Sequence, residues 1–466
     1  MYKKSKYILE IENYDGDYIA YNITNGKYFN VSKENKERFK DILSFSDKYI
    51  KTTVFQTLAQ YGFIIHEKHN EHREMDFRYS NTCRSDKKFK IIIMPTEKCN
   101  FNCIYCYQNH KKGAMTIETQ NALVSAVAKK IKTYNSLHVE WFGGEPLLEI
   151  GMIESLSLKF QEICAEQKKS YVASMTTNGY YLDYNTFKKM RKCNVSSFQV
   201  TLDGLEEYHD SNRTLFDGTG TFNKIISNLD EIKEKDISSF WKISIRTNYT
   251  KENIMQKEKW EKYIDDNFLC DKRFEYIPKY AFETTNNEDI SHLLFTDAII
   301  NDVSVLDEIA KIDETKIHRE LKSRSKDVEF TGKVKAELDK MIFGGMICYA
   351  GTNSSIIIGA DGTLYKCTIL LYENENIVGK LDSKSKDFIY YHQKYLYWIS
   401  PGLNDNEQLE CSNCILYPIC LSISCPKETR PENKNRKLFC KYLYQWIYNH
   451  ILALSYEPKN EELNLE

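Results

Sequence analysis

Hydrophobic and polar positions change period repeatedly along the middle of the chain. Short apolar runs of strand length alternate with longer amphipathic segments, such as Phe222–Lys235, where apolar residues recur three and four positions apart. Ile117–Lys132 is a second predicted helix of this kind. The predicted strands are Lys90–Met94, Leu137–Phe142, Tyr171–Thr176, Ser197–Leu202, Lys242–Thr247 and Arg273–Ile277. This succession predicts an α/β fold with a parallel sheet, either open or curled into part of a barrel.

The first 80 residues show a different pattern, in which short strands come before helices. The predicted elements are strands at Tyr7–Glu12, Asp17–Asn22 and Lys27–Val31, helices at Ser32–Leu43 and Thr53–Tyr61, and a strand at Phe63–Ile65. The dipeptide Asn25-Gly26 predicts the hairpin turn before the third strand. The polar segment Glu67–Lys88 is predicted to be a linker.

The pattern changes again after the predicted sheet. A charged, helical stretch is followed by a cysteine-rich, irregular region and by a predicted final helix at Lys441–Tyr456. The predicted domains are a small N-terminal unit at 1–80, the α/β part at 88–284, a helical connector at 285–342, the cysteine-rich part at 343–440 and a C-terminal helix and tail at 441–466.

Composition narrows the class of protein. The chain has 466 residues, and 42% of them are hydrophobic, which is typical of a globular protein. The formal net charge of −2 gives no sign of a nucleic-acid partner. The longest apolar runs, such as Ile91–Met94, are far shorter than a membrane helix, so we expect no membrane partner. Glu10 and Glu12 interrupt the N-terminal segment and exclude a secretory signal there, so we expect a cytoplasmic protein.

The 14 cysteines give the clearest indication of the protein's chemistry. Thiols stay reduced in the cytosol, so crowded cysteines there indicate metal ligands more than disulfides. Cys99, Cys103 and Cys106 follow the first predicted strand with the spacing C-x3-C-x2-C. Three thiolates can hold three irons of a [4Fe–4S] cluster and leave the fourth iron open to another ligand. A zinc site with His110 as an added ligand remains the alternative.

This cysteine motif resembles the signature of the radical SAM superfamily, which has an aromatic residue, here Tyr105, before its last cysteine. Further motifs of that family follow at the ends of successive predicted strands. They are Gly143-Gly144-Glu145-Pro146, Thr177-Asn178-Gly179, Thr201-Leu202-Asp203-Gly204 with His209-Asp210 and Arg213, and Arg246-Thr247-Asn248. The resemblance implies a partial (β/α)6 barrel of the TIM type that binds a [4Fe–4S] cluster and S-adenosylmethionine (SAM).

The resemblance also assigns roles to single residues. Gly143, Gly144 and Glu145 would engage the methionine amino group of SAM. Thr201 and Arg213 would bind its ribose hydroxyls and its carboxylate, which suits the planar fork of an arginine. The remaining implied contacts with SAM are Tyr105, Asn178 and Arg246.

The C-terminal cysteines resemble the SPASM domain, an irregular iron–sulfur domain that holds two auxiliary [4Fe–4S] clusters. The resemblance assigns Cys411, Cys414, Cys420 and Cys440 to the outer cluster and Cys348, Cys367 and Cys425 to the inner cluster. Four residues separate Cys420 from Cys425 here, where the family pattern has three. Cys164 and Cys193 fit apolar helix faces and are predicted to be buried thiols.

SPASM-bearing radical SAM enzymes modify peptides and proteins. The order of elements in the N-terminal unit resembles the winged-helix-like, PqqD-like domain that binds leader peptides in pathways of ribosomally made, modified peptides (RiPPs). The resemblance therefore implies a peptide maturase with three [4Fe–4S] clusters that forms an intramolecular thioether and takes electrons from a flavodoxin or ferredoxin. Alternatives are a carbon–carbon crosslinking or epimerising maturase, a sulfatase-maturase-type Cys/Ser oxidase, and a non-enzymatic Fe–S or zinc regulatory protein.

Overall fold

The computed structural model describes residues 1–44, 46–83, 87–281, 321–344, 347–399, 411, 413–420, 425–427 and 436–457. The chain divides into two compact units. The first comprises Met1–Arg84, Val303–Thr352 and Ile399–Glu466, and the second comprises Ser85–Asp302 and Asn353–Trp398. Among the described residues, no helix combines the length and apolar character needed to cross a membrane.

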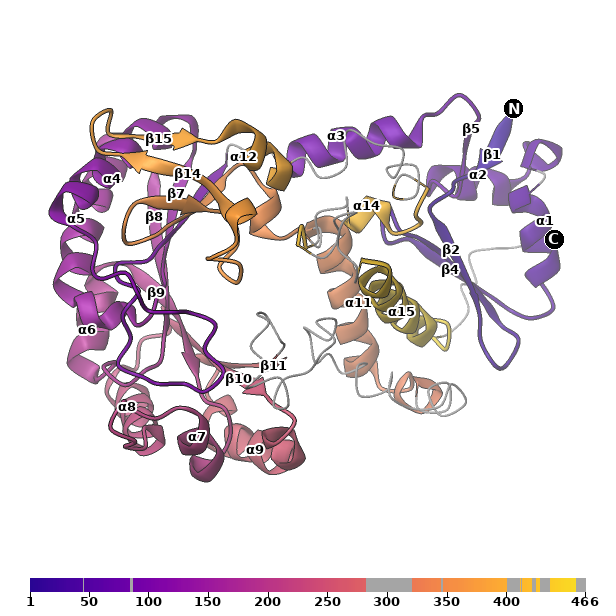
Figure 1. Ribbon diagram of the computed structural model, residues 1–466. Helices are drawn as coiled ribbons and strands as arrows, with labels where there is room; N and C mark the ends of the chain where they lie inside the picture. The colour runs from indigo at the N-terminus through magenta and orange to yellow at the C-terminus, as the bar shows by residue number, and fades with distance from the viewer. Residues whose placement is uncertain are drawn as a thin grey trace. The chain divides into compact units, whose positions relative to one another are not determined.

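The second unit is built on six parallel strands that follow one another in chain order (Figure 1). They are β6 (Lys88–Ile93), β7 (Ser136–Trp141), β8 (Ser170–Thr177), β9 (Val195–Thr201), β10 (Lys242–Tyr249) and β11 (Phe274–Tyr280). The connecting helices are α4 (Ile117–Lys130), α5 (Ile150–Glu166), α6 (Tyr184–Lys192), α7 (Glu206–Asn212), α8 (Phe222–Lys235) and α9 (Lys257–Ile264). The predicted partial barrel is thereby confirmed, with each predicted strand present.

Alternation along the strands explains why one side of this sheet is covered by helices. In β7 the apolar residues Leu137, Val139 and Trp141 are fully buried, while the intervening His138 and Glu140 are only partly buried. The polar residues make contacts with neighbouring strands: the His138 Nε2 atom lies 3.0 Å from the Ser174 hydroxyl, and a salt bridge of 2.7 Å joins Glu140 to β6. One face of the sheet therefore packs against helices, and the other is polar.

The parallel sheet continues into the cysteine-rich part of the chain, where the sequence pattern predicted no strands. Strand β12 (Ser355–Ile358) pairs in parallel with β6. Strands β13 (Thr363–Tyr365), β14 (Ile377–Asp382) and β15 (Asp387–Tyr390) then extend the sheet in antiparallel order, and α12 (His392–Ile399) follows. The result is one sheet of ten strands. Because β12 is only four residues long, it falls at the lower limit of what a periodicity argument detects.

The first unit contains the predicted N-terminal sheet of β2 (Ile8–Glu12), β3 (Tyr18–Asn22) and β4 (Tyr28–Val31). One face packs on α1 (Lys36–Ser44) and α2 (Thr53–Gln60). The short strands β1 (Tyr2–Lys4) and β5 (Ile64–His66) pair separately. The predicted linker after β5 is instead largely helical, since α3 spans Glu71–Cys83.

The other face of the N-terminal sheet is covered by helices from distant parts of the sequence. These are α11 (Val328–Gly344) and α15 (Arg436–Leu454), whose apolar residues share a core with Leu9, Ile19 and Tyr21. The short helix α14 (Tyr417–Cys420) belongs to the same unit and contributes Ile419. The predicted C-terminal helix is thus confirmed. The predicted domains at 1–80 and 441–466 share one core, and the proposed domain boundaries remain predictions.

Candidate functional site

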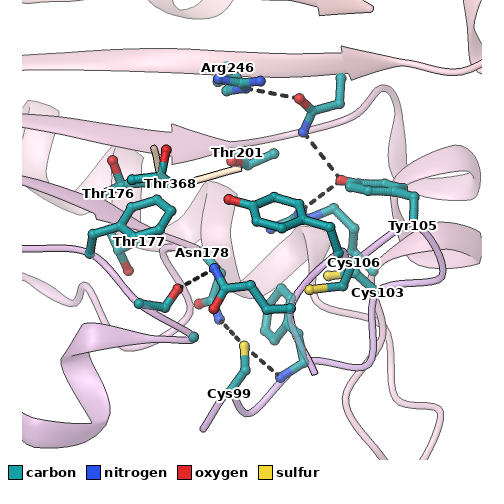
Figure 2. Close-up of a pocket in the computed structure, with 18 of the residues that line it drawn as sticks. Cys99, Cys103, Tyr105, Cys106, Thr176, Thr177, Asn178, Thr201, Arg246 and Thr368 are labelled. Atoms are coloured by element: carbon teal, nitrogen blue, oxygen red, sulfur yellow. Dashed lines mark hydrogen bonds between the residues drawn. The ribbon is translucent and has the colours of Figure 1, made fainter. Parts of the chain in front are cut away.

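A cavity of about 330 Å³ opens at the carboxyl ends of the parallel strands in the second unit (Figure 2). Its wall includes the three clustered cysteines and all the implied SAM contacts except Glu145. These residues are Cys99, Cys103, Cys106, Tyr105, Gly143, Gly144, Asn178, Thr201, Arg213 and Arg246. The predicted site residues thus lie together at the strand ends of this unit, and their roles remain predictions.

The cysteines lie on the segment 96–110, here termed the cysteine loop, which follows β6 directly. Two backbone hydrogen bonds hold it to the chain after α7: the Asn102 N–H donates to the Thr214 carbonyl at 2.8 Å, and the Ile104 N–H donates to the Asn212 carbonyl at 3.1 Å. The three thiols are free, and no disulfide joins them. The loop is therefore anchored by main-chain contacts that do not involve the cysteine side chains.

The three thiols do not share one electrostatic environment. Burial raises the pKa of Cys99 to about 12 and that of Cys103 to about 11. Burial also acts to raise the pKa of Cys106, but contact with His110 and the charges of His110 and Arg213 outweigh it, so this pKa is lowered. The His110 Nε2 atom lies 3.4 Å from the Cys106 sulfur. Cys106 is therefore the thiol that ionises most readily.

The paired glycines pack against the cysteine loop. A Cβ atom on Gly144 would lie 2.1 Å from the Lys98 carbonyl oxygen, and one on Gly143 would lie 2.4 Å from the Thr96 carbonyl oxygen. Gly143 also has a φ of +134°, which side chains disfavour. The family resemblance assigned these glycines a contact with SAM. The structure shows that close approach to the loop backbone already requires them.

Glu145 is fully buried beneath the cavity and braces two strand ends. Its carboxylate accepts hydrogen bonds from the Leu147 N–H at 2.9 Å, the Thr177 hydroxyl at 2.7 Å and the Asn178 N–H at 2.7 Å. Burial raises its pKa to about 7 against the effect of these donors. Asn178 in turn donates to Asn100 Oδ1 at 2.8 Å. Glu145 therefore acts on the cavity by positioning Asn178 and the end of β8.

A buried polar network forms another part of the wall. Arg213 donates to the Tyr105 hydroxyl at 2.7 Å and lies 3.7 Å from the Asp203 carboxylate, which also contacts Tyr105. Arg246 donates to Asn248 Oδ1 at 2.9 Å, and the Asn248 N–H donates to Asp203 at 2.8 Å. Burial alone would lower the pKa of Arg213, but Cys103, Tyr105 and Asp203 outweigh it and raise this pKa. Arg213 therefore stays charged.

His209 and Asp210, two other residues of this motif, support the network from behind. The Thr221 hydroxyl donates to the Arg213 carbonyl and lies 3.0 Å from His209 Nε2, while the Asp203 N–H donates to His209 Nδ1. Burial lowers the pKa of His209 well below its usual value, so the ring is neutral. Asp210 accepts from the Thr221 N–H at 2.7 Å at the start of α8. Both residues hold Arg213 in place rather than line the cavity.

The comparisons with known proteins agree with this geometry. Residues 93–262 match the model of the radical SAM superfamily. This part of the chain is a radical SAM domain. This matched part, the radical SAM domain, contains the complete cysteine motif and every implied SAM contact.

Two curated proteins that are similar in sequence to this chain are named as different enzymes. The chain is 26% identical over 264 residues to the radical SAM cyclopropyl synthase TigE of Paramaledivibacter caminithermalis, covering 50% of this chain and 54% of that protein. It is 22% identical over 387 residues to the cysteine-type anaerobic sulfatase-maturating enzyme of Clostridium novyi, covering 80% of this chain and 98% of that protein. The chain therefore spans only about half the length of the first relative.

The fold also matches a solved structure, native anSMEcpe with bound AdoMet and Cp18Cys peptide. The TM-score is 0.52 at 17% sequence identity, and the match covers 79% of this chain and all of that chain. At this identity the likeness concerns the fold, in which radical SAM domains bind SAM and a [4Fe–4S] cluster.

The residues present fit these two groups. The cysteine loop supplies three thiols to one cavity, which is the donor set that a cluster with an open iron requires. The Nε atom of Arg213 is buried and has no hydrogen-bond partner among the described residues, although the side chain lines the cavity. Such an atom suits a bound anionic or polar ligand, because an unsatisfied buried donor is costly. SAM carries a carboxylate that would meet this requirement.

Several cavity residues were missed by sequence reasoning. Thr176 and Gln199 lie on β8 and β9 and line the cavity, but their polar side chains look like ordinary alternating strand positions. Thr368 and Ile369 come from the segment after β13. Their one sequence signal was the neighbouring Cys367. Cys164 and Cys193, by contrast, are buried as predicted, with 1% and 3% exposure.

The predicted auxiliary-cluster cysteines are distributed over both units. Cys367 belongs to the second unit, and the others belong to the first. Those are Cys348, Cys411, Cys414, Cys420, Cys425 and Cys440. The Cys414 N–H donates to the Cys411 carbonyl at 3.0 Å in a tight turn. No three His, Cys, Asp or Glu side chains in the described parts of the chain are grouped closely enough for a single metal ion. Their assignment to two clusters remains a prediction.

Proposed function

We propose that the chain is a radical SAM peptide maturase that installs an intramolecular thioether in a ribosomally made precursor peptide. The observation that carries the proposal is the cavity itself, in which a three-cysteine loop, a charged buried Arg213 and polar strand ends surround one space. When bound, the clusters and SAM would supply a 5′-deoxyadenosyl radical that takes one hydrogen atom from the substrate, and an auxiliary cluster as acceptor of the electron left when the thiol loses its proton and the C–S bond forms. The protein's task is to hold these groups and the substrate in register and to keep water away.

Different residues would hold the cluster, SAM and the backbone around them. Cys99, Cys103 and Cys106 would hold the cluster, with Cys106 ionising first because of His110. Arg213 would donate to the SAM carboxylate through its free Nε atom, while Tyr105 keeps the guanidinium in place. Thr201, Asn178 and Arg246 offer polar contacts at the ends of β9, β8 and β10, and Gly143 and Gly144 keep the backbone close to the cysteine loop.

Two features support a peptide substrate. The relatives include a sulfatase-maturating enzyme matched over 98% of its length, and a related fold was solved with a bound Cp18Cys peptide. The N-terminal sheet of β2, β3 and β4, followed by α1 and α2, has the element order of a leader-binding unit. Such units bind by adding a peptide strand to a sheet edge. We propose that the leader binds this unit and that a flavodoxin or ferredoxin donates electrons.

Thioether formation is favoured over carbon–carbon coupling by the position of Cys367. This residue, an implied ligand of the inner cluster, directly precedes the cavity residues Thr368 and Ile369. Only three cysteines are implied for that cluster, so one iron would be open to a soft thiolate from the substrate. The two other implied ligands are Cys348 and Cys425.

A sulfatase-maturase-type oxidation is the second candidate, because the match to that relative extends over nearly all of it. The discriminating experiment uses the anaerobically purified, reduced chain with SAM and a synthetic precursor peptide that contains one cysteine. A thioether predicts loss of two hydrogen atoms per crosslink and protection of the cysteine from alkylation. A precursor with that cysteine replaced by alanine must then remain unmodified. Modification of the alanine version would instead indicate carbon–carbon coupling or epimerisation, and conversion of cysteine to an aldehyde would indicate the sulfatase-type reaction.

A further inference from the structure

One part of the cavity wall comes from outside the radical SAM domain. Most of the described residues that line the cavity lie within 93–262, but Ala281, Thr368 and Ile369 do not. Thr368 and Ile369 belong to the segment between β13 and β14, here termed the wall segment, residues 366–372. Figure 2 draws Thr368 among the side chains around the cavity. The Ile369 side chain is apolar and 41% exposed.

One buried side chain, that of Asn376, fixes the backbone of the wall segment. Asn376 is fully buried, and its Oδ1 atom accepts from the N–H groups of Lys366 at 3.0 Å and Cys367 at 2.8 Å. Its Nδ2 atom donates to the carbonyls of Cys367 at 2.8 Å and Leu370 at 2.9 Å. Both donors and both acceptor positions of the amide are therefore used on this segment. Ile369 is thus an exposed apolar residue on a fixed backbone.

Two further contacts tie the wall segment to the rest of the second unit. The buried Lys366 ammonium donates to the Ser355 carbonyl at 2.8 Å at the start of β12, which pairs with β6. At the other end, the Tyr372 hydroxyl accepts from the Asn109 N–H of the cysteine loop at 3.0 Å. The segment therefore spans from the extended sheet to the cysteine loop and is part of the same cavity.

The cavity wall comes from two parts of the chain, the radical SAM domain and the wall segment, which suggests that the two parts have different roles. The radical SAM model ends at residue 262, so the wall segment lies outside the matched domain. The groups that this domain binds, a cluster and SAM, are common to radical SAM enzymes, whereas the residues that contact the substrate must differ between enzymes with different substrates. A rigid wall outside the matched domain, with an exposed apolar side chain, has the properties expected of a substrate-reading surface.

We propose that the wall segment is the specificity surface of the cavity and that Ile369 packs against the apolar part of the peptide residue that loses hydrogen. Thr368 supplies a polar contact beside it. This inference rests on the proposed function as a peptide maturase. It adds the class of peptide residue that this subsite would accept, namely a residue with an aliphatic or aromatic side chain. A peptide residue with a charged side chain is excluded, because burial of an unpaired charge against Ile369 would be costly.

The test compares three variants of the full chain as anaerobically purified holoprotein: Ile369→Ala, Ile369→Leu and Ile389→Ala. Ile389 lies on β15 and has the same 41% exposure, but it does not line the cavity, so it is the matched control. The probe is the same synthetic, cysteine-containing peptide that tests the proposed function. Measurements are the KM for this peptide and the amount of 5′-deoxyadenosine released per modified peptide.

We expect Ile369→Ala to raise both quantities roughly tenfold, because loss of an apolar contact of this size weakens substrate positioning by about that factor. Ile369→Leu should restore most of the coupling, and Ile389→Ala should match the wild type. Thr368→Val, which keeps the shape and removes the hydroxyl, should lower coupling without the same rise in KM. Because Ile369 is exposed, none of its variants is expected to unfold the protein.

The outcomes separate the two proposals. If the wild type modifies the peptide and Ile369→Ala behaves like Ile389→Ala in both measurements, the specificity surface is overturned and the proposed function stands. If the wild type releases 5′-deoxyadenosine but never alters the peptide, the proposed function is overturned, and this inference falls with it. A tenfold effect at Ile369 with rescue by leucine supports both.

Discussion

At the scale of single residues, the candidate site consists of groups that touch the cavity and groups that hold those in place. Tyr105 and Arg213 line it, whereas Glu145 and His209 are fully buried and act through backbone and side-chain hydrogen bonds. The motif residues of this family thus fall into both groups. Substitutions should therefore separate loss of the groups that bind from loss of the groups that position.

Replacing Cys103 with alanine should abolish SAM cleavage. The cluster needs three thiolates to leave one iron open for SAM, and the loop itself is anchored by backbone hydrogen bonds that the substitution does not touch. The measurement is 5′-deoxyadenosine released by the anaerobically reconstituted variant. Cys270→Ala, at an exposed cysteine without a motif, is the control. Wild-type release from the Cys103 variant would contradict the assignment of the cysteine loop.

His138 should make the second unit sensitive to acid. Burial, together with Lys88 and Lys90, lowers its pKa from 6.5 to about 3. The unfolded chain then binds a proton between these two pH values that the folded chain does not, so stability present above pH 6.5 is lost as the pH falls. His138→Gln removes this titrating group. Between roughly pH 8 and pH 5.5, the midpoint of thermal unfolding should therefore fall less in the variant than in the wild type. Parallel pH profiles for the two proteins would contradict this prediction.

At the scale of elements, the N-terminal sheet has no free face in the described structure. Its β3 strand alternates between two cores, with Tyr18 and Ala20 toward α1 and α2, and Ile19 and Tyr21 toward α11 and α15. A leader peptide could therefore join this unit at a sheet edge but not on a sheet face. Deletion of residues 1–80 alone would uncover the apolar side of α15 and would be a poor test of leader binding.

A single core substitution measures that packing. Ile19→Ala should destabilise the first unit by about 2–5 kcal/mol, because a fully buried side chain leaves a cavity between β3 and the helices. Ile237→Ala, at a residue that is 92% exposed, should have little effect. Protease susceptibility and thermal unfolding of the two variants provide the comparison. Equal stability of the two variants would show that α15 does not depend on the sheet.

Asn376 allows a similar test in the second unit. Asn376→Ala removes four hydrogen bonds to the wall segment and should speed amide hydrogen exchange there by roughly tenfold or more, since each lost buried bond costs about 1 kcal/mol. Asn374→Ala changes an exposed neighbour and serves as control. Unchanged exchange over residues 367–371 would mean that other contacts hold the segment.

At the scale of the whole molecule, the cysteines predicted to bind auxiliary clusters are shared between two compact units. Most lie in the unit that also contains the N-terminal sheet, while Cys367 lies in the unit with the radical SAM domain. Iron content is the property of the intact chain that tests this arrangement.

The wild-type protein should contain about twelve irons per chain, as three four-iron clusters require. Cys414→Ala, in the predicted outer cluster, should lower this to roughly eight and should leave SAM cleavage measurable, because the cysteine loop is in the other unit. Iron and sulfide analysis with electron paramagnetic resonance gives the count. About four irons in the wild type would refute the two auxiliary clusters.

The sequence by itself determined the parts of this protein that depend on local pattern. Alternating periods were enough for the six parallel strands, because each buried strand must present an apolar run between turns. The spacing of Cys99, Cys103 and Cys106 was enough to predict that three thiols line one cavity, because three side chains on one short loop need no distant partner. The residues after successive strands could be placed together, because parallel strands end at one edge of the sheet.

Only the tertiary structure decided what depends on distant contacts. The pairing of β12 with β6 joins residues far apart in the chain and brings Ile369 to the cavity, which no local pattern encodes. The same is true of α15, whose apolar side is covered by an N-terminal sheet. The reason is physical: periodicity shows that a face must be buried, but the partner that buries it is selected by packing over the whole chain.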